Sequence, residues 1–113
     1  MLADTPRFIA VDIAYPGAKS YFQTMVIRQR DLTRATDVNQ RTGASFAGTV
    51  VPAVMSGHAA QCLDFMRDEL IPFIDAHYPT ASGDRTCAGH SLGGLFGCFA
   101  LFTHPETFTR YVI

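Results

Sequence analysis

The sequence predicts an α/β protein built on a parallel β-sheet. Segments typical of strands and of helices alternate along the chain, and a Gly-x-Ser-x-Gly pattern falls at one strand-to-helix junction. The 113 residues are 48% hydrophobic and 17% charged, which is typical of a globular chain that buries a core. We therefore expect one domain over residues 1–113.

The first half of the chain contains one clear element. Residues 8–15 are mostly apolar and rich in strand formers, and Pro16 and Gly17 close the run. This pattern predicts a strand covered on both faces, as in a parallel sheet. Residues 18–57 have mixed polarity and no clean period, so we expect a functional excursion or partial disorder there. Residues 28–33 contain a cluster of charged side chains within that stretch.

The next segment predicts an amphipathic helix over residues 58–78, with Ser56 as a candidate cap. An apolar stripe recurs at steps of three and four residues, at Leu63, Met66, Leu70, Ile74 and Tyr78. Pro72 interrupts this stripe and predicts a kink or a division into two helices, because proline lacks a backbone N–H.

Three shorter elements complete the alternation. Residues 85–90 predict a strand, and residues 92–103 predict a helix that is apolar on almost every face and hence buried. Pro105 ends that helix, and residues 107–113 begin another strand. The order strand, helix, strand, helix, strand is typical of a parallel sheet with flanking helices.

Composition excludes several classes of partner. Nine Lys and Arg face ten Asp and Glu, for a net charge of −1, which gives no reason to expect nucleic acid or an anionic membrane. No apolar run is long enough to span a bilayer, and residues 1–7 lack the layout of a signal peptide. Cys62, Cys87 and Cys98 lack metal-type spacing, so we expect reduced thiols and, by default, a cytoplasmic protein. The sequence leaves the oligomeric state open.

The motif that indicates chemistry is Gly89-His90-Ser91-Leu92-Gly93. A sharp strand-to-helix turn would strain Ser91 and lift its hydroxyl above the sheet edge as a nucleophile. Small residues at Gly89 and Gly93 would avoid a collision across this turn. The backbone N–H of Leu92, at the positive end of the following helix, is a candidate oxyanion donor. The alternative is a glycine-rich turn with an incidental serine.

A serine nucleophile needs a histidine base and usually a carboxylate that orients it. After Ser91 only His104 and Glu106 remain, and a helix that rises 1.5 Å per residue places His104 about 18 Å away. His90 adjoins the serine but should point elsewhere, and the remaining two, His58 and His77, are expected at the surface or at a helix end. The sequence thus predicts a serine nucleophile without the histidine base and the carboxylate that would activate it.

From Tyr15 onward the chain resembles the Putative esterase family of α/β-hydrolases, which includes esterase D-like and enterobactin-type siderophore esterases. The Gly-His-Ser-Leu-Gly-Gly core is common to many hydrolases, but its combination with Glu-Leu-Ile-Pro upstream is more specific. The matching stretches are residues 14–17, 30–33, 68–75 with Tyr78, and 85–96, followed by Pro105, Phe108 and Tyr111.

This resemblance implies a partial α/β-hydrolase fold and a serine esterase that cleaves a small-molecule ester through an acyl-enzyme, with no cofactor. It carries over Ser91 as the catalytic residue and, more weakly, Leu92 as oxyanion donor. It also places a loop of residues 28–33 near the substrate, with Arg30 contacting an acidic or phenolic group. An ion pair between Arg30 and Asp31 is the alternative.

Three hypotheses follow from the absence of a histidine base and its carboxylate after Ser91. In the first, the chain is an internal piece of a serine esterase, because members of the family are more than twice as long and carry their acid and histidine beyond this point. In the second, it is a non-catalytic binding module on the same scaffold. In the third, a second chain supplies the histidine and the acid, so that activity requires an oligomer.

Overall fold

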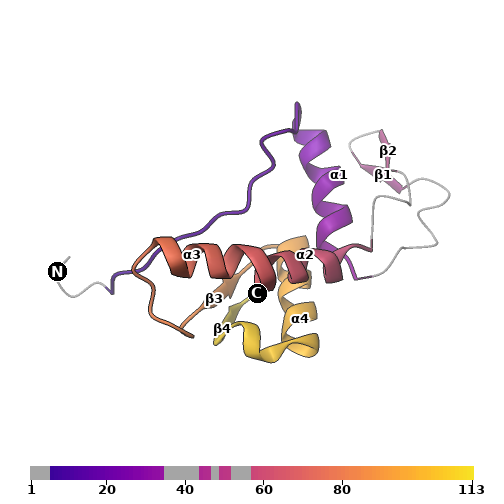
Figure 1. Cartoon of the computed structure of the whole chain (residues 1–113). Coiled ribbons are helices and arrows are strands. Elements are labelled where there is room, and N and C mark those ends of the chain that lie inside the picture. Colours follow the sequence, from indigo (N-terminus) through magenta and orange to yellow (C-terminus); the bar gives the residue numbers. More distant parts are fainter. Residues whose placement is uncertain (1–5, 35–43, 47–48, 52–56) are drawn as a thin grey trace.

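The computed structural model describes residues 6–34, 44–46, 49–51 and 57–113. Over these residues the chain is an α/β protein in which helices surround a short parallel pair of strands, as the sequence predicts (Figure 1). The core consists of Ala59, Leu63, Phe96 and Ala100, each at most 3% exposed. These four residues come from two helices, so the core lies between helix α2 (Ala59–Phe65) and helix α4 (Leu92–Thr103).

The C-terminal third forms a β-α-β unit. Strand β3 (Thr86–Ala88) leads into α4, and the 3₁₀ turn η5 (Pro105–Thr107) then leads into strand β4 (Arg110–Val112). The two strands pair in parallel with Cys87 opposite Tyr111. This confirms the predicted strand, helix, strand order, although both strands are shorter than the predicted ranges of residues 85–90 and 107–113.

The predicted helix over residues 58–78 is confirmed as three continuous segments. Helix α2 passes into a π-helical turn, η4 (Met66–Leu70), and then into helix α3 (Ile71–His77) (Figure 1). The N–H of Ile71 reaches back to the carbonyl of Met66, five residues earlier. Pro72 follows directly and supplies no N–H, so the wider turn absorbs the interruption that the sequence predicts. His58 is the N-cap, and Ser56 lies outside the described residues.

Helix α1 (Tyr21–Leu32) lies where the sequence shows no clean period. The expectation of an excursion without elements is therefore wrong for these residues. The amide of Gln23 donates to the Ser20 hydroxyl at 3.1 Å, and the Gln23 side chain accepts from the amide of Lys19 at 2.6 Å. This arrangement is close to a capping box, whose Ser-x-x-Gln signature is present in the sequence. The helix has no fully buried residue, so no apolar stripe marks it.

Two further findings concern the first half of the chain. Strands β1 (Ala44–Phe46) and β2 (Thr49–Val51) form an antiparallel pair that the sequence does not predict. The predicted strand over residues 8–15 is wrong, because this segment is extended but pairs with no described strand. Phe8 is 82% exposed, against the predicted covering on both faces. A strand needs a neighbour for its backbone groups, and none of the described strands pairs with this segment.

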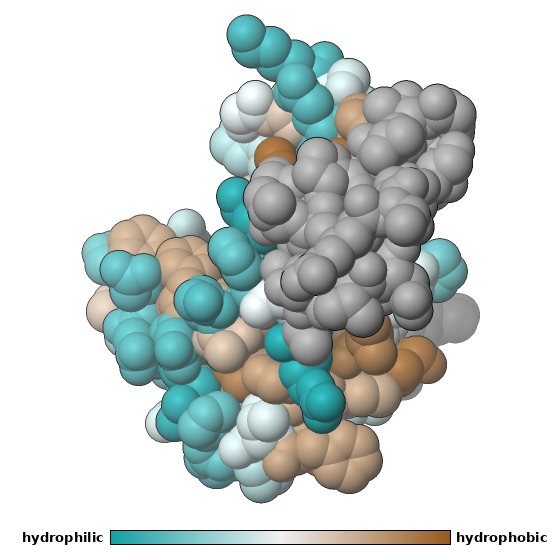
Figure 2. Space-filling view, turned by 90° about the vertical axis from the view of Figure 1, so that its right-hand side faces the viewer, coloured by the Kyte–Doolittle hydropathy of each residue, from teal (hydrophilic) through white to brown (hydrophobic). Residues whose placement is uncertain are grey.

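Helix α4 is buried along one side only, contrary to the prediction for its whole circumference. Gly94, Phe96 and Gly97 are buried, but Phe102 is 83% exposed and Leu95 is 53% exposed. The latter two line a hollow of about 300 Å³ on the outer side of the helix. Apolar residues accordingly reach the surface on the lower part of the face drawn in Figure 2.

Candidate active site

The predicted strand-to-helix turn at residues 89–93, called the elbow from here on, lies between β3 and α4 and contains one strained residue. Ser91 has φ 58° and ψ −116°, and among the described residues it is the one non-glycine position with positive φ. Such a conformation costs about 1–3 kcal/mol and persists where the surrounding structure enforces it. The side chain is exposed, so the strained turn presents its hydroxyl to solvent.

Hydrogen bonds on both sides of Ser91 enforce this turn. The amide of Gly89 donates to the carbonyl of Val112 at 2.9 Å and so ties the end of β3 to β4. The amide of Gly93 donates to the carbonyl of His90 at 3.0 Å, and the amide of Leu95 donates to that of Ser91 at 3.0 Å. The turn is therefore fixed by the sheet before the serine and by the helix after it.

The two elbow glycines differ in the room that they leave. A Cβ on Gly89 would lie 2.3 Å from the carbonyl carbon and oxygen of Gly93 and 2.7 Å from the amide of Gly94. A Cβ on Gly93 would meet nothing within 4 Å among the described residues. The predicted collision is thus present at Gly89, where backbone meets backbone, and the prediction is wrong for Gly93.

Helix α4 starts immediately after the serine, with Leu92 as its first residue. The first N–H groups of an α-helix have no partner within the helix and carry its partial positive charge. The amide of Leu92 therefore lies at the end of the helix where an anion next to Ser91 would be stabilised. No acidic residue lies in this first turn to oppose that charge.

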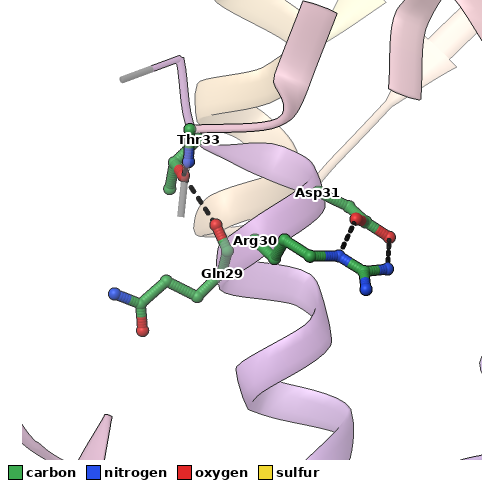
Figure 3. Close-up of polar contacts among 5 residues, drawn as sticks. Gln29, Arg30, Asp31 and Thr33 are labelled. Carbon is green, nitrogen blue, oxygen red and sulfur yellow. Dashed lines mark hydrogen bonds and ion pairs between the residues drawn. The ribbon is translucent and has the colours of Figure 1, made fainter. Parts of the chain in front are cut away.

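The segment that contains Arg30 is helical, which corrects the expected loop. Arg30 and Asp31 belong to the last turn of α1. The Arg30 guanidinium binds the Asp31 carboxylate through two contacts, of 2.6 and 3.2 Å (Figure 3). The hydrogen bond to Asp31 raises the pKa of Arg30 above its ordinary value. Arg30 thus forms the alternative ion pair rather than presenting a free cation to a substrate.

Arg28 is the arginine that reaches the elbow, a role that the sequence does not indicate. Its Nη2 donates to the carbonyl of His90 at 3.4 Å, across 62 residues of sequence. Its Nε is shielded from solvent and has no hydrogen-bond partner among the described residues. No sequence signal distinguishes Arg28 from Arg30, because the choice depends on which face of α1 meets the elbow.

No base is hydrogen-bonded to Ser91 among the described residues. None of their hydrogen bonds involves the Ser91 hydroxyl. The Nδ1 of His77 lies 2.8 Å from the Phe73 carbonyl, and the Nδ1 of His104 lies 3.3 Å from a Glu106 oxygen. Since His104 caps the far end of α4, the distance argument from the sequence agrees with the fold.

Other site chemistry is limited in the described part of the chain. No group of three or more His, Cys, Asp or Glu residues there has an arrangement that would hold a metal ion. Burial raises the pKa of the Cys62 thiol to about 11, so this cysteine is not poised as a nucleophile. Among the described helices, none is sufficiently long and apolar to cross a bilayer.

A parallel strand, a strained serine turn and a helix that starts at the serine define a partial fold of the α/β-hydrolase class. The model of the family described as Putative esterase matches residues 18–113, and the chain belongs to this family.

Relatives and a solved structure agree with this assignment. The chain is 34% identical over 106 residues to a siderophore enterobactin esterase of Emericella nidulans, an alignment that covers 92% of this chain and 34% of that protein. It is 35% identical over 77 residues to a siderophore triacetylfusarinine C esterase of Aspergillus fumigatus, covering 67% of this chain and 26% of the relative. The structure matches the siderophore hydrolase EstA from Aspergillus nidulans with a TM-score of 0.61 and 32% identity, over 86% of this chain and 31% of EstA. The chain thus spans about a third or less of the length of these relatives.

Proposed function

We propose that this chain carries the nucleophile of a serine carboxylic-ester hydrolase, with Ser91 as the attacking residue. The observation that supports this most directly is the positive φ of Ser91 at a strand-to-helix turn. A strained serine has a cost that a purely structural turn would avoid, because glycine adopts the same conformation freely. Membership of an esterase family supplies a reason for retaining the serine.

The reaction would pass through an acyl-enzyme. The Ser91 oxygen attacks the ester carbonyl, its proton passes to a base, and the negative charge moves to the carbonyl oxygen. The amide of Leu92, at the positive end of α4, donates to that oxyanion. The alcohol then leaves with a proton from the base, and water hydrolyses the acyl group and restores the serine. No metal or organic cofactor takes part in this scheme.

The base and its orienting carboxylate are the missing parts of this scheme. No described histidine forms a hydrogen bond with the Ser91 hydroxyl, and the relatives are about three times as long as the chain. We propose that polypeptide other than the described residues supplies both groups, either as a further part of the same protein or from a second chain. In the former case, the chain is an internal piece of a longer esterase.

The substrate class follows from the relatives, which are siderophore esterases by name. We propose a small-molecule ester of the siderophore type as the substrate. The three free thiols, all only partly exposed, fit a reducing compartment such as the cytoplasm.

Covalent labelling tests the nucleophile directly. The purified chain is exposed to a fluorophosphonate probe, and the adduct is located by mass spectrometry, with Ser91→Ala as the matched control. An adduct on Ser91 that disappears in the control means that a base reaches the serine in the chain or its oligomer. Titration of the protein concentration separates these two cases, because a base from a second chain makes labelling depend on concentration. The proposal would be overturned by a folded chain whose Ser91 is never labelled, even when a longer form of the protein that carries the base is added.

A non-catalytic binding module is the second candidate. The absence of a hydrogen bond from any described residue to the Ser91 hydroxyl favours it. This alternative predicts that a siderophore ester binds to the chain and remains intact, which calorimetry and analysis of the recovered ligand would detect. It also predicts that Ser91→Ala binds the ester as well as the unaltered chain does.

A further inference from the structure

The side chain of Arg28 connects helix α1 to the elbow. Its Nη2 donates to the His90 carbonyl at 3.4 Å. The same carbonyl accepts the amide of Gly93 at 3.0 Å. One carbonyl oxygen therefore receives two donors, one from the helix that follows the serine and one from a helix 62 residues earlier in the chain.

This carbonyl belongs to the peptide group that leads into Ser91. The φ angle of Ser91 is the rotation about its N–Cα bond, so it is measured against the plane of that peptide. Two donors on the His90 oxygen restrain this plane and with it the φ of 58° at Ser91. The contact thus acts on the one strained non-glycine residue among those that the structure describes.

The guanidinium of Arg28 is not occupied by an acid, in contrast with that of Arg30. Arg30 is bound by Asp31 through two contacts, whereas no described carboxylate forms an ion pair with Arg28. The Nε of Arg28 is also shielded from solvent and finds no partner in the part of the chain that the structure describes. Burying a donor without a partner costs free energy. The hydrogen bond from Nη2 to the His90 carbonyl offsets part of that cost.

Helix α1 holds the arginine in place. The amide of His58 donates to the carbonyl of Arg30 at 2.8 Å, and the amide of Ala59 donates to that of Thr33 at 2.9 Å. The Thr33 hydroxyl donates to the carbonyl of Gln29 at 2.6 Å (Figure 3) and accepts the amide of Gly57 at 2.7 Å. These bonds join the end of α1 to the start of α2, whose Ala59 and Leu63 are in the core.

We propose that Arg28 is a positioning residue that fixes the peptide between His90 and Ser91 and so holds the nucleophile turn. Its consequence for catalysis rests on the proposed function of Ser91, but its effect on the elbow does not. Arg28 acts on the serine through the backbone and needs no contact with the substrate.

Hydrogen exchange of the backbone amides over residues 90–95 tests this role without relying on activity. In Arg28→Ala we expect these amides to exchange about tenfold faster, the scale set by loss of one hydrogen bond to a charged group. Arg30→Ala is the matched control, because it removes the same charge from the same helix at a residue that Asp31 engages. We expect less than a twofold change at the elbow in that variant.

The labelling rate of Ser91 with a saturating neutral fluorophosphonate is the second readout. Arg28→Ala should lower this rate about tenfold, and Arg28→Lys should restore part of both effects because it keeps a charged donor. If Arg28→Ala fails to fold, exchange is compared between Arg28→Lys and Arg30→Lys, and faster exchange at the elbow is expected in the former alone. Equal exchange at the elbow in the Arg28 and Arg30 variants would overturn the proposal. A parent chain that stays unlabelled even when a longer form of the protein that carries the base is added would instead overturn the function of Ser91, and the exchange result would still decide the role of Arg28.

Discussion

Gly89 is the position where the elbow tolerates no side chain, so Gly89→Ala probes the turn most directly. Its Cβ would lie 2.3 Å from two backbone atoms of Gly93 and 2.7 Å from a third atom, the amide of Gly94. No side chain can move aside to relieve this contact, so β3 and α4 must separate. Overpacking of a core costs about 1–3 kcal/mol, and we expect the upper end here. For a chain of this size, about 3 kcal/mol lowers the melting temperature by about 10 °C.

Gly93→Ala is the matched control, because the same methyl group would meet nothing within 4 Å. Gly93 is the second residue of α4, where alanine is favoured over glycine by up to about 1 kcal/mol. Thermal denaturation followed by circular dichroism should therefore show a large fall for Gly89→Ala and an unchanged or higher midpoint for Gly93→Ala. Equal midpoints for the two variants would refute the close contact described at Gly89.

Three further predictions concern single residues. Ser91→Gly should be more stable than Ser91→Ala by about 1 kcal/mol, because glycine accepts a positive φ without strain; equal melting temperatures would mean that the turn is not strained. The hydrogen bond from Arg85 lowers the pKa of Asp75, so the stability from this pair is complete above the unfolded pKa of about 4 and is lost as the pH falls through the lower folded value. Melting curves from pH 7 to about pH 3 should accordingly lose less stability in Asp75→Asn than in the unaltered chain. With its pKa raised to about 11, native Cys62 should react slowly with iodoacetamide at about pH 8 and quickly in denaturant, and fast modification of the native chain would contradict its burial.

The elbow could be predicted from the sequence because its determinants are local. Gly-x-Ser-x-Gly between a short strand and an apolar helix specifies the turn, and the structure has its one strained serine among the described residues there. The helix with Pro72 was predictable for the same reason, since a missing N–H acts on the turn that contains it. In both cases the residues that decide the conformation lie within a few positions of one another.

What could not be predicted depends on contacts between distant segments. Residues 8–15 have a strand composition, but a strand requires a neighbour, and no described strand pairs with them. The choice between Arg28 and Arg30 depends on the face that α1 turns toward His90. Neither fact can be obtained from the charged pattern of residues 28–33, which contains both arginines in similar surroundings.

Three separate elements hold the peptide groups around Ser91 and together maintain its strained conformation. Strand β4 holds Gly89 through the Val112 carbonyl, while the first turn of α4 holds the His90 carbonyl through Gly93. Helix α1 supplies a second donor to that carbonyl through Arg28. A strained conformation persists when its surroundings determine it more than once, because the loss of one contact leaves the others in place. Loss of one contact, as in Arg28→Ala, should therefore loosen the turn without abolishing it, and Ser91 should leave its positive φ only when contacts from two elements are removed together.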